Sequence, residues 1–449
     1  MPMSRDVRRA VPHVVRLGLL GLGSVGAAFA ELVDDDHEGI DRRVGLKLEI
    51  TRIAVHDTTK SRGKLRRLER ITGDAAAVVS DPEVDVVVEL VGGIEPARSL
   101  ILAALRAGKP VVTANKELLA ELGPELFSVA ESAGRPLLFE AAVAGAIPLV
   151  RALRVSLVGE RVRRILGIVN GTTNYILSEM SEKGVSYASA LETAQRLGYA
   201  ERNPSADVGG HDAAAKAAIL ASIAFSADVV ATDVYREGIE AIETADIEFA
   251  HRLGYEVKLL AVAEQFDAVE GSPMIAVRVH PAMVPVEHPL ATIRGPFNAV
   301  FVEGDSAGEL MLFGRGAGGR PTASAVLGDV IDAAGSLGLE GGLRFAPRHR
   351  AEIRPIGELR AQYYVAIDVS DRPGVLAAVA AVFGEHNVSV RSMEQVGLGD
   401  EARLVFITHL ARESDLQATL GDLARLDAVR RVGGLIRVVG QEREEATPA

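Results

Sequence analysis

The sequence predicts an α/β protein with a doubly wound parallel sheet, a middle α+β domain and a small C-terminal βαββαβ domain. Over the first part of the chain, short β-rich runs alternate with helical segments, which is typical of a parallel sheet with crossover helices. From about 141 to 310, helical and strand segments mix without that alternation. From 361 to 440 the order is strand, helix, strand, strand, helix, strand, which predicts a separate compact unit.

Local patterns define the elements of the first part. Residues 14–20 (VVRLGLL) form a buried-type strand, and GLGSVG at 21–26 leads into a segment with helical apolar spacing. Further strands are expected at 48–57, 84–91, 110–115 and from 136, with helices at about 99–108 and 117–133. A glycine turn between strand and helix lets a pyrophosphate approach the helix N-terminus, so we expect a Rossmann-type dinucleotide-binding domain. Its predicted cofactor contacts are Gly21, Leu22, Gly23, Ser24, Val25 and Gly26.

Composition excludes several classes of function. The 449 residues carry 61 acidic and 49 basic side chains, a net charge of −12, so nucleic acid is not an expected partner. The absence of cysteine excludes disulfides, thiolate metal sites and thiol nucleophiles. Arg8, Arg9 and the apolar run after them resemble a secretory signal, but Arg16 and four glycines interrupt that run. No stretch approaches the roughly 20 apolar residues that span a bilayer. We therefore expect a cytoplasmic protein without a membrane partner.

The end of the second strand bears on the choice of cofactor. Asp57 could bind a ribose diol, which favours NAD. Lys60, Arg62 and Lys64 follow and could hold a 2′-phosphate, although a solvated basic loop is an equal alternative. The sequence leaves NADP or NAD open, with a slight preference for NADP.

Two lysines are candidates for chemistry. Lys116 follows the carboxyl end of a predicted strand, where open α/β sheets bind ligands, although a surface lysine at a helix start is the alternative. Lys216 stands one helical turn after Asp212 in DVGGHDAAAK, among alanines that give no cover for a solvated helix. A partly desolvated lysine is a usable proton donor near neutral pH. An ordinary i,i+4 ion pair between Asp212 and Lys216 is the alternative.

Seven strings in order carry a resemblance to a known family. They are GLGSVG, ELVGGIEPAR, AGKPVVTANK, EAAVAGAIP, NGTTNYIL, GYAERNPSADVGGHDAAAK and GAGGRPTASAV. Together they resemble the homoserine dehydrogenases over about residues 14–350, and the last unit, with DRPGVL at 371–376, is similar to an ACT regulatory domain. The resemblance implies reversible, NAD(P)-dependent reduction of L-aspartate 4-semialdehyde to L-homoserine, in threonine, methionine and isoleucine biosynthesis. A semialdehyde dehydrogenase that works through a thioester would need a cysteine, which the chain lacks.

The resemblance also implies residue roles. Lys216 would protonate the aldehyde oxygen, Lys116 would lie between cofactor and substrate, and Asp212 would orient Lys216. The implied substrate-binding residues are Glu201, Asp207, Thr172 and Asn174, with Glu201 on the amino group. Gly318 would approach the cofactor. A sodium or potassium ion would be held largely by backbone oxygens of Glu140, Val143, Gly145 and Ile147.

Two positions depart from the family pattern. Many relatives carry arginine where His56 stands, and there it favours NADP. His211 stands between Gly210 and Asp212, where an apolar residue is usual, and we expect a packing variant rather than a second proton relay.

The expected domains follow the same divisions of the chain. They are 1–139 for the dinucleotide, with a return at about 307–340, 140–306 for substrate, catalysis and dimerisation, 341–360 as a linker, 361–440 as the ACT-like domain and 441–449 as a disordered tail. We expect a small-molecule substrate, an amino-acid effector, most simply threonine, and a homodimer or homotetramer. For the ACT-like domain, a dimerisation module without ligand is the alternative. For the whole chain, the alternative is a non-catalytic sensor of amino acids or nucleotides, which could lose Lys116 and Lys216.

Overall fold

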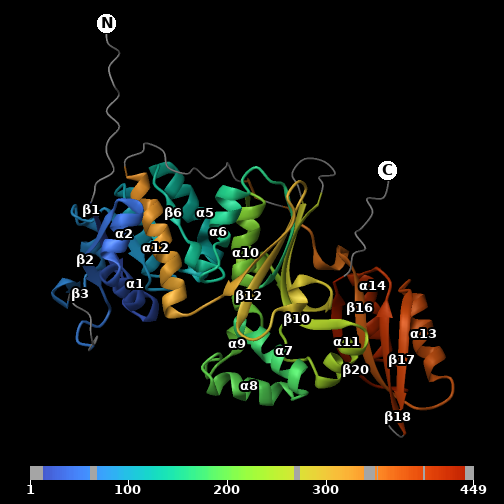
Figure 1. Ribbon diagram of the computed structural model, residues 1–449. Helices are drawn as coiled ribbons and strands as arrows, with labels where there is room; N and C mark the ends of the chain where they lie inside the picture. Colours follow the sequence, from blue (N-terminus) through green and yellow to red (C-terminus); the bar gives the residue numbers. More distant parts are fainter. Residues whose placement is uncertain are drawn as a thin grey trace. The chain divides into compact units, whose positions relative to one another are not determined.

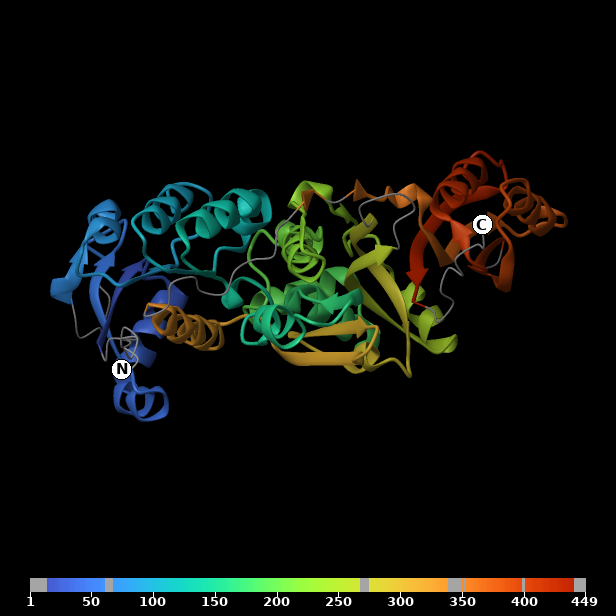
Figure 2. The same cartoon turned by 90° about the horizontal axis from the view of Figure 1, so that it is seen from above.

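The computed structural model describes residues 14–60, 68–266, 274–337, 349–350, 352–397 and 400–439. The chain forms two compact units, whose elements are labelled in Figure 1 and seen from above in Figure 2. Unit 1 comprises Met1–Arg161, Ala218–Thr232 and Leu312–Ala351, and unit 2 comprises Val162–Ala217, Asp233–Met311 and Glu352–Ala449. Arg62, Lys64 and the predicted tail at 441–449 lie outside the described residues.

Unit 1 contains a six-stranded parallel sheet of order β3-β2-β1-β4-β5-β6. Its strands are β1 (Val14–Leu20), β2 (Lys47–Ala54), β3 (Ile71–Thr72), β4 (Val86–Glu89), β5 (Val111–Thr113) and β6 (Leu137–Leu138). The order reverses between β1 and β4, as in dinucleotide-binding sheets that bind their ligand at this point. The predicted doubly wound parallel sheet is confirmed.

Helices cover this sheet. They are α1 (Ser24–Asp35), α2 (His37–Val44), α3 (Ala75–Ser80), α4 (Ala97–Arg106), α5 (Lys116–Ala133), the short α6 (Leu149–Arg151) and α12 (Gly319–Ser336). In Figure 1 α12 lies beside α1, although almost 300 residues separate them in the sequence. Phe29 of α1, Val330 of α12 and Val88 of β4 share one buried apolar cluster, so the chain returns to complete the core of this domain.

Unit 2 is built on a mixed sheet of order β13-β12-β7-β10-β11-β20-β16-β18-β17. Its centre is a long antiparallel hairpin whose strands pair from Tyr255↔Pro285 to Phe266↔Met274. The first half of the sheet contains β7 (Val162–Ile168), β10 (Tyr255–Phe266), β11 (Met274–Pro285), β12 (Phe297–Gly304) and β13 (Gly308–Arg315). The helices of this part are α7 (Gly171–Lys183), α8 (Tyr187–Arg196), α9 (Ser205–Val208), α11 (Thr244–Arg252) and, as far as Ala217, α10 (His211–Ala224).

The C-terminal part of unit 2 has the predicted βαββαβ order. It consists of β16 (Arg360–Ser370), α13 (Val375–Glu385), β17 (Val390–Gly397), β18 (Glu401–Thr408), α14 (Glu413–Leu423) and β20 (Val429–Val438), with a short added strand β19 (Ala411–Arg412). Strand β20 pairs in parallel with β11, with Ala282 opposite Arg437 and Met283 opposite Val438. The small domain therefore continues the sheet of the preceding domain.

Short strands form at several positions in both units. They are β8 (Ala227–Asp228), β9 (Tyr235–Arg236), β14 (His349–Arg350) and β15 (Glu352–Ile353). Strands β14 and β15 lie in the interval predicted as a linker, where β14 pairs with β8 and β15 with β11. Among the helices of the described residues, none combines the length and the apolar character needed to cross a membrane.

Candidate active site

The three glycines of GLGSVG have different surroundings in unit 1. A Cβ on Gly21 would lie 2.5 Å from the carbonyl oxygen of Leu90, and one on Gly26 would lie 2.4 Å from the oxygen of Gly21. Around Gly23, the N-cap residue of α1, a Cβ would meet nothing within 4 Å. Two glycines thus permit a tight turn and close packing, while the middle one leaves an open approach to the helix N-terminus. This arrangement fits a dinucleotide pyrophosphate.

Glu89 is a buried residue that the sequence analysis did not select. It joins the ends of two neighbouring strands by hydrogen bonds. Glu89, at the end of β4, is 0% exposed. Its carboxylate accepts hydrogen bonds from Thr113 Oγ1 at 2.6 Å, Val91 N at 2.8 Å and Gly92 N at 3.0 Å. These contacts tie the loop after β4 to the end of β5, at the carboxyl edge of the sheet. The one signal in the sequence is an acidic residue inside the apolar run VDVVVELV.

Lys116 is exposed at the first position of α5, whose N-cap Asn115 accepts a hydrogen bond from Leu118 N. Strand β2 ends at Ala54, earlier than the predicted Asp57, and His56, Asp57 and Lys60 are exposed in the loop that follows. Asp57 Oδ1 accepts hydrogen bonds from Thr59 N at 2.8 Å and Thr59 Oγ1 at 2.6 Å, so this carboxylate also shapes its own turn.

Gly318 stands where the chain returns to unit 1. It is the N-cap residue of α12 and has a φ of 121°, a conformation that favours glycine. A Cβ on the next residue, Gly319, would lie 3.1 Å from the oxygen of Ser24, at the start of α1. The start of α12 is therefore packed against the glycine turn.

The turn predicted to hold a monovalent cation is also buried. Glu140 is 5% exposed, and its two carboxylate oxygens accept hydrogen bonds from Val150 N at 2.8 Å and Arg151 N at 2.7 Å. Burial raises the pKa of Glu140, and these backbone hydrogen bonds oppose the shift. Both carboxylate oxygens of Glu140 are therefore engaged by backbone N–H groups of the following segment. Gly145 has a φ of 58°, and a Cβ there would lie 2.5 Å from the carbonyl of Gly316. No cluster of three or more metal-ligating side chains occurs in the part of the chain that the structure describes.

Lys216 lies at the centre of a buried polar group in unit 2. Its side chain is 10% exposed and that of Asp212 is 7% exposed. Lys216 Nζ donates to Asp212 Oδ2 at 2.7 Å and to the carbonyl oxygen of Val169 at 2.7 Å. Helix α10 is apolar on nearly all sides, which explains the burial of this pair. Asp212 and Lys216 thus form the i,i+4 ion pair of the alternative interpretation, but the pair is buried rather than solvated.

A residue that sequence analysis did not select bridges this group. Asn170 Nδ2 donates to Asp207 Oδ1 at 2.6 Å and to Asp212 Oδ2 at 2.8 Å. Its Oδ1 accepts from Thr173 N at 2.9 Å, which makes Asn170 the N-cap of α7. Asp207, Asp212, Lys216 and Asn170 thus form one connected set. Its signal in the sequence is the first letter of NGTTNYIL.

The other predicted substrate-binding residues are Thr172, Glu201 and Asn174, and each has surroundings of its own. Thr172 is half-buried, and its hydroxyl donates to Tyr199 O at 2.6 Å. Glu201 is exposed, as is His211 at the first position of α10. Asn174 is 1% exposed, and its Nδ2 donates to the carbonyl oxygens of residues 295 and 297 at 2.9 and 3.2 Å.

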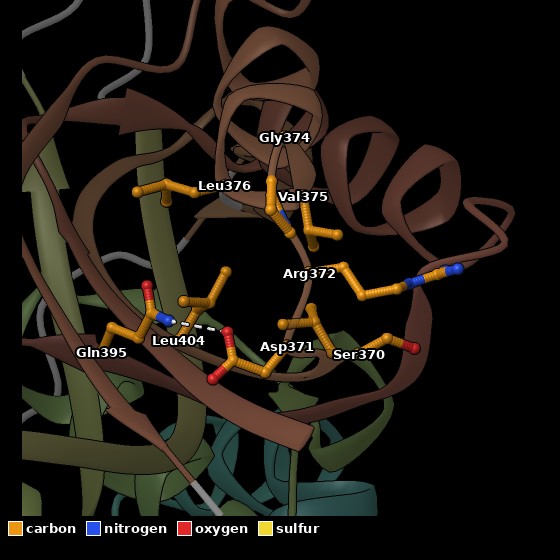
Figure 3. A pocket seen from close by; sticks show the side chains of 10 residues that line it. Ser370, Asp371, Arg372, Gly374, Val375, Leu376, Gln395 and Leu404 are labelled. Atoms are coloured by element: carbon orange, nitrogen blue, oxygen red, sulfur yellow. Dashed lines mark hydrogen bonds between the residues drawn. The ribbon is translucent and has the colours of Figure 1, made fainter. Parts of the chain in front are cut away.

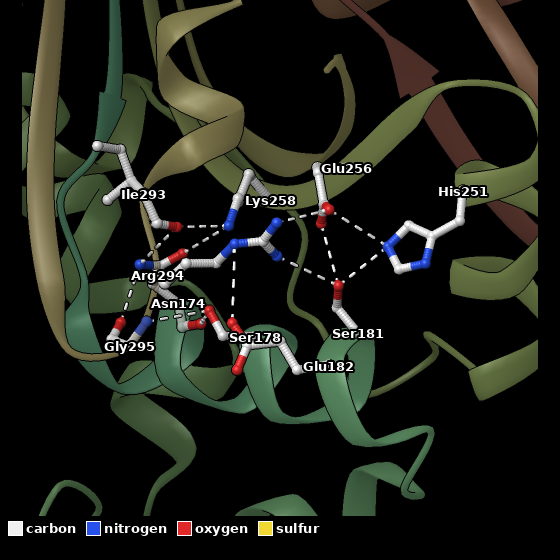
Figure 4. Close-up of polar contacts among 10 residues, drawn as sticks. All are labelled: Asn174, Ser178, Ser181, Glu182, His251, Glu256, Lys258, Ile293, Arg294 and Gly295. Atoms are coloured by element: carbon white, nitrogen blue, oxygen red, sulfur yellow. Dashed lines mark hydrogen bonds and ion pairs between the residues drawn. The ribbon is translucent and has the colours of Figure 1, made fainter. Parts of the chain in front are cut away.

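Asn174 also belongs to a second polar cluster, drawn in Figure 4. Lys258, which is 1% exposed, donates to Ile293 O at 2.6 Å and to Asn174 Oδ1 at 3.4 Å. Burial, reinforced by the charge of Arg294, lowers the pKa of Lys258 to about 8. This cluster anchors α7 to the segment before β12.

A pocket of about 330 Å³ lies in the C-terminal domain, at the turn between β16 and α13. Figure 3 shows Asp371, Arg372, Gly374 and Gln395 around it, with Gln395 Nε2 3.5 Å from Asp371 Oδ1. Gly374 has a φ of 92° and precedes the 11-residue helix α13. The DRPGVL turn thus borders a cavity of a size that a small ligand could occupy.

Comparisons with known proteins match this organisation. The models "Homoserine dehydrogenase, NAD binding domain", "Homoserine dehydrogenase" and "ACT domain" match residues 21–140, 148–331 and 363–428. The chain is 49% identical over 433 residues to homoserine dehydrogenase of Mycobacterium tuberculosis, covering 95% of this chain and 98% of that protein. It is also 49% identical over 426 residues to the Corynebacterium glutamicum protein of the same name, covering 94% and 95%.

Solved structures agree with the sequence relatives. A homoserine dehydrogenase from Thiobacillus denitrificans superposes with a TM-score of 0.88 at 38% identity, covering 95% of this chain and 98% of that chain. A hyperthermophilic archaeal homoserine dehydrogenase mutant in complex with NADPH has a TM-score of 0.60 at 28% identity, covering 71% of this chain and 97% of that chain.

Fold, glycine turn and domain order define an NAD(P)-dependent oxidoreductase with a C-terminal ACT domain. More particularly, the chain belongs to the homoserine dehydrogenase family. The sensor alternative is therefore set aside, and the nucleotide-binding unit takes a nicotinamide cofactor.

Proposed function

We propose that Lys216 is the proton donor in the reversible reduction of L-aspartate 4-semialdehyde to L-homoserine. The observation that carries the proposal is the buried Lys216 ammonium, held by Asp212 and by the carbonyl oxygen of Val169. An ammonium has three donors, so one remains for a substrate oxygen. The nicotinamide supplies hydride transfer when it is bound. As the carbonyl carbon gains hydride, negative charge develops on its oxygen, and a proton from Lys216 neutralises that charge.

The surrounding residues have supporting roles in this proposal. Asp212 keeps the ammonium in place, because a buried cation needs a charged or hydrogen-bonded partner. Asp207, Thr172 and Glu201 contribute to substrate binding, with Glu201 on the amino group. Lys116 is the second lysine of the proposal and assists at the carbonyl.

Replacing Lys216 tests this role. We expect Lys216→Ala to lower the turnover of homoserine oxidation by roughly 100-fold or more, the usual scale of general acid–base loss. Lys183→Ala is the matched control, since Lys183 makes an i,i+4 pair with Glu179 at 2.7 Å but is 58% exposed. Near-normal turnover of the Lys216 variant, measured with NAD and NADP in parallel assays, would rule out the role.

For the cofactor we propose NADP in preference to NAD. Lys60 is exposed in the loop after β2, on the side of the chain where a 2′-phosphate is expected, and a related archaeal enzyme was solved with NADPH. Asp57 and the absence of arginine at His56 favour NAD instead. The parallel assays of the native enzyme with both cofactors decide between them.

For the turn at 140–147 we propose a sodium or potassium ion. Neutral backbone oxygens of Glu140, Val143, Gly145 and Ile147 suit a hard monovalent cation. The proposal is supported by the buried position of this turn, in which Glu140 is 5% exposed.

The ACT domain is the proposed site of feedback regulation, with threonine as effector. Backbone N–H groups after Gly374 open an 11-residue helix beside the pocket, where a carboxylate would be stabilised. The polar groups of Asp371 and Gln395 border the same cavity and could bind an amino or hydroxyl group.

A pocket variant of the full chain tests this regulation. We expect Gln395→Ala to weaken threonine inhibition while homoserine turnover without threonine stays unchanged, because Gln395 is exposed and its hydrogen bond goes to Asp371 of the same domain. Met393→Ala, on the same strand β17 and 40% exposed, is the control and should respond like the native enzyme. Equal inhibition of both variants, or no inhibition of the native enzyme, would contradict the proposal.

A further inference from the structure

We propose that Asn170 is a positioning residue that sets the geometry of the proton donor by holding Asp207 and Asp212 together. The proposal rests on the role of Lys216 given above. It assigns a function to a side chain that caps a helix with one end and bridges two carboxylates with the other.

The orientation of the Asn170 amide follows from its helix contact. Thr173 N is a backbone donor and lies 2.9 Å from Oδ1, so this atom must be the oxygen. Thr173 Oγ1 lies 3.0 Å from the same oxygen. The nitrogen therefore faces the carboxylates, and its two protons match the two acceptors, Asp207 Oδ1 and Asp212 Oδ2.

This bridge controls Lys216 through a shared atom. Asp212 Oδ2 accepts both Asn170 Nδ2 at 2.8 Å and Lys216 Nζ at 2.7 Å, so a shift of the amide moves the partner of the ammonium. The residue before Asn170 provides the second contact, because Val169 O accepts from Lys216 Nζ. Asn298 Nδ2 donates to the same carbonyl at 2.9 Å and fixes it. Two consecutive residues at the junction of β7 and α7 thus hold the lysine.

The charges of Asp207 and Asp212 explain why a neutral amide suits position 170. Asp207 and Asp212 are two like charges brought to one nitrogen, and Asp212 is buried. A neutral group with two donors satisfies both carboxylates without adding charge, and the N-terminus of α7 favours their negative charge. A side chain without two donors would release one carboxylate.

The test separates helix capping from positioning. Asn170→Ser keeps a good N-cap, but one hydroxyl cannot cap the helix and bridge two carboxylates. We expect it to lower kcat for homoserine oxidation by at least roughly tenfold, with a melting temperature near the native value. Ser186→Ala removes the N-cap of α8 alone, where Ser186 Oγ accepts from Ser189 N, and should lower stability without changing kcat.

A second variant tests the pH dependence of kcat, which a purely structural role of Asn170 would not change. Asn170→Asp retains the cap acceptor and places a third carboxyl beside Asp207 and Asp212. When protonated, this carboxyl can donate one hydrogen bond, so the kcat deficit should shrink as the pH is lowered. A native-like kcat in Asn170→Ser, or a deficit in Asn170→Asp that is constant with pH, would overturn the inference. If Lys216→Ala retains activity, the proposed proton donor fails instead, which distinguishes the two proposals.

Discussion

At the scale of single residues, Asp329 is a buried carboxylic acid that lies outside the group of residues around Lys216. It is 4% exposed in α12, and its Oδ2 accepts a hydrogen bond from Glu140 N at 2.7 Å. Burial, together with the neighbouring charge of Glu140, raises the pKa of Asp329 to about 7. The folded protein then binds a proton that the unfolded chain has released. This group therefore lowers the stability as the pH rises from about 4 to about 7.

Asp329→Asn should remove that part of the pH dependence. The amide oxygen can still accept from Glu140 N, but the side chain no longer ionises. Between pH 5 and 8 we expect the native melting temperature to fall by a few degrees more than that of the variant. Melting curves across this range test it, with Asp35→Asn, an exposed position of α1, as the control. Parallel curves for native enzyme and Asp329→Asn would contradict the assignment.

At the scale of elements, helix α7 is held by hydrogen bonds along its first two turns. Ser178 Oγ accepts from Gly295 N at 3.1 Å, and Lys258 reaches both Asn174 and Ile293. Figure 4 shows these contacts converging on one side of the helix. The register of α7 against the segment before β12 is therefore set, and with it the position of Asn170 at the helix start.

The same helix shows how far sequence alone leads. The parallel sheet and the βαββαβ unit were predictable because strand runs, glycine turns and helical spacing are local signals. NGTTNYIL pointed to α7, but the hydrogen bonds of Asn170 reach residues 37 and 42 positions away. Local periodicity does not encode such contacts. For the same reason, the sequence did not predict the two-residue strand β3 or the pairing of β20 with β11.

At the scale of the whole molecule, the ACT domain and the preceding domain are joined by an ion pair of the buried Arg437 as well as by a shared sheet. Arg437 of β20 has a side chain 4% exposed, and it contacts Glu413 at 2.8 Å and Glu237 at 2.8 Å. Glu237 is followed by residues that touch the turn before Asp212, since Ile239 N donates to Val208 O at 2.9 Å. The charge of Arg437 thus stabilises a segment beside the Lys216 group.

Truncation before residue 361 should therefore damage the enzyme itself. It would remove the β20 partner of β11, the Arg437 partner of Glu237, and the Tyr364 hydroxyl that donates to buried Asp246 at 3.0 Å. We expect lower turnover, a lower melting temperature and association through the exposed strand edge. Size-exclusion chromatography and melting curves test this, with full-length Gln395→Ala as the control. A monodisperse truncated chain with native stability and turnover would show that the domains are separable.

The pairing of β11 with β20 also has a consequence for synthesis. Roughly 150 residues separate the paired positions 282 and 437, and at about 5–20 residues per second a ribosome needs on the order of 10 s to bridge them. During that interval part of the β11 edge has no partner from its own chain, at the stage when nascent chains are most prone to associate. The ACT domain is thus the last segment to close the sheet, so a nascent chain that stalls before residue 429 would leave that edge open.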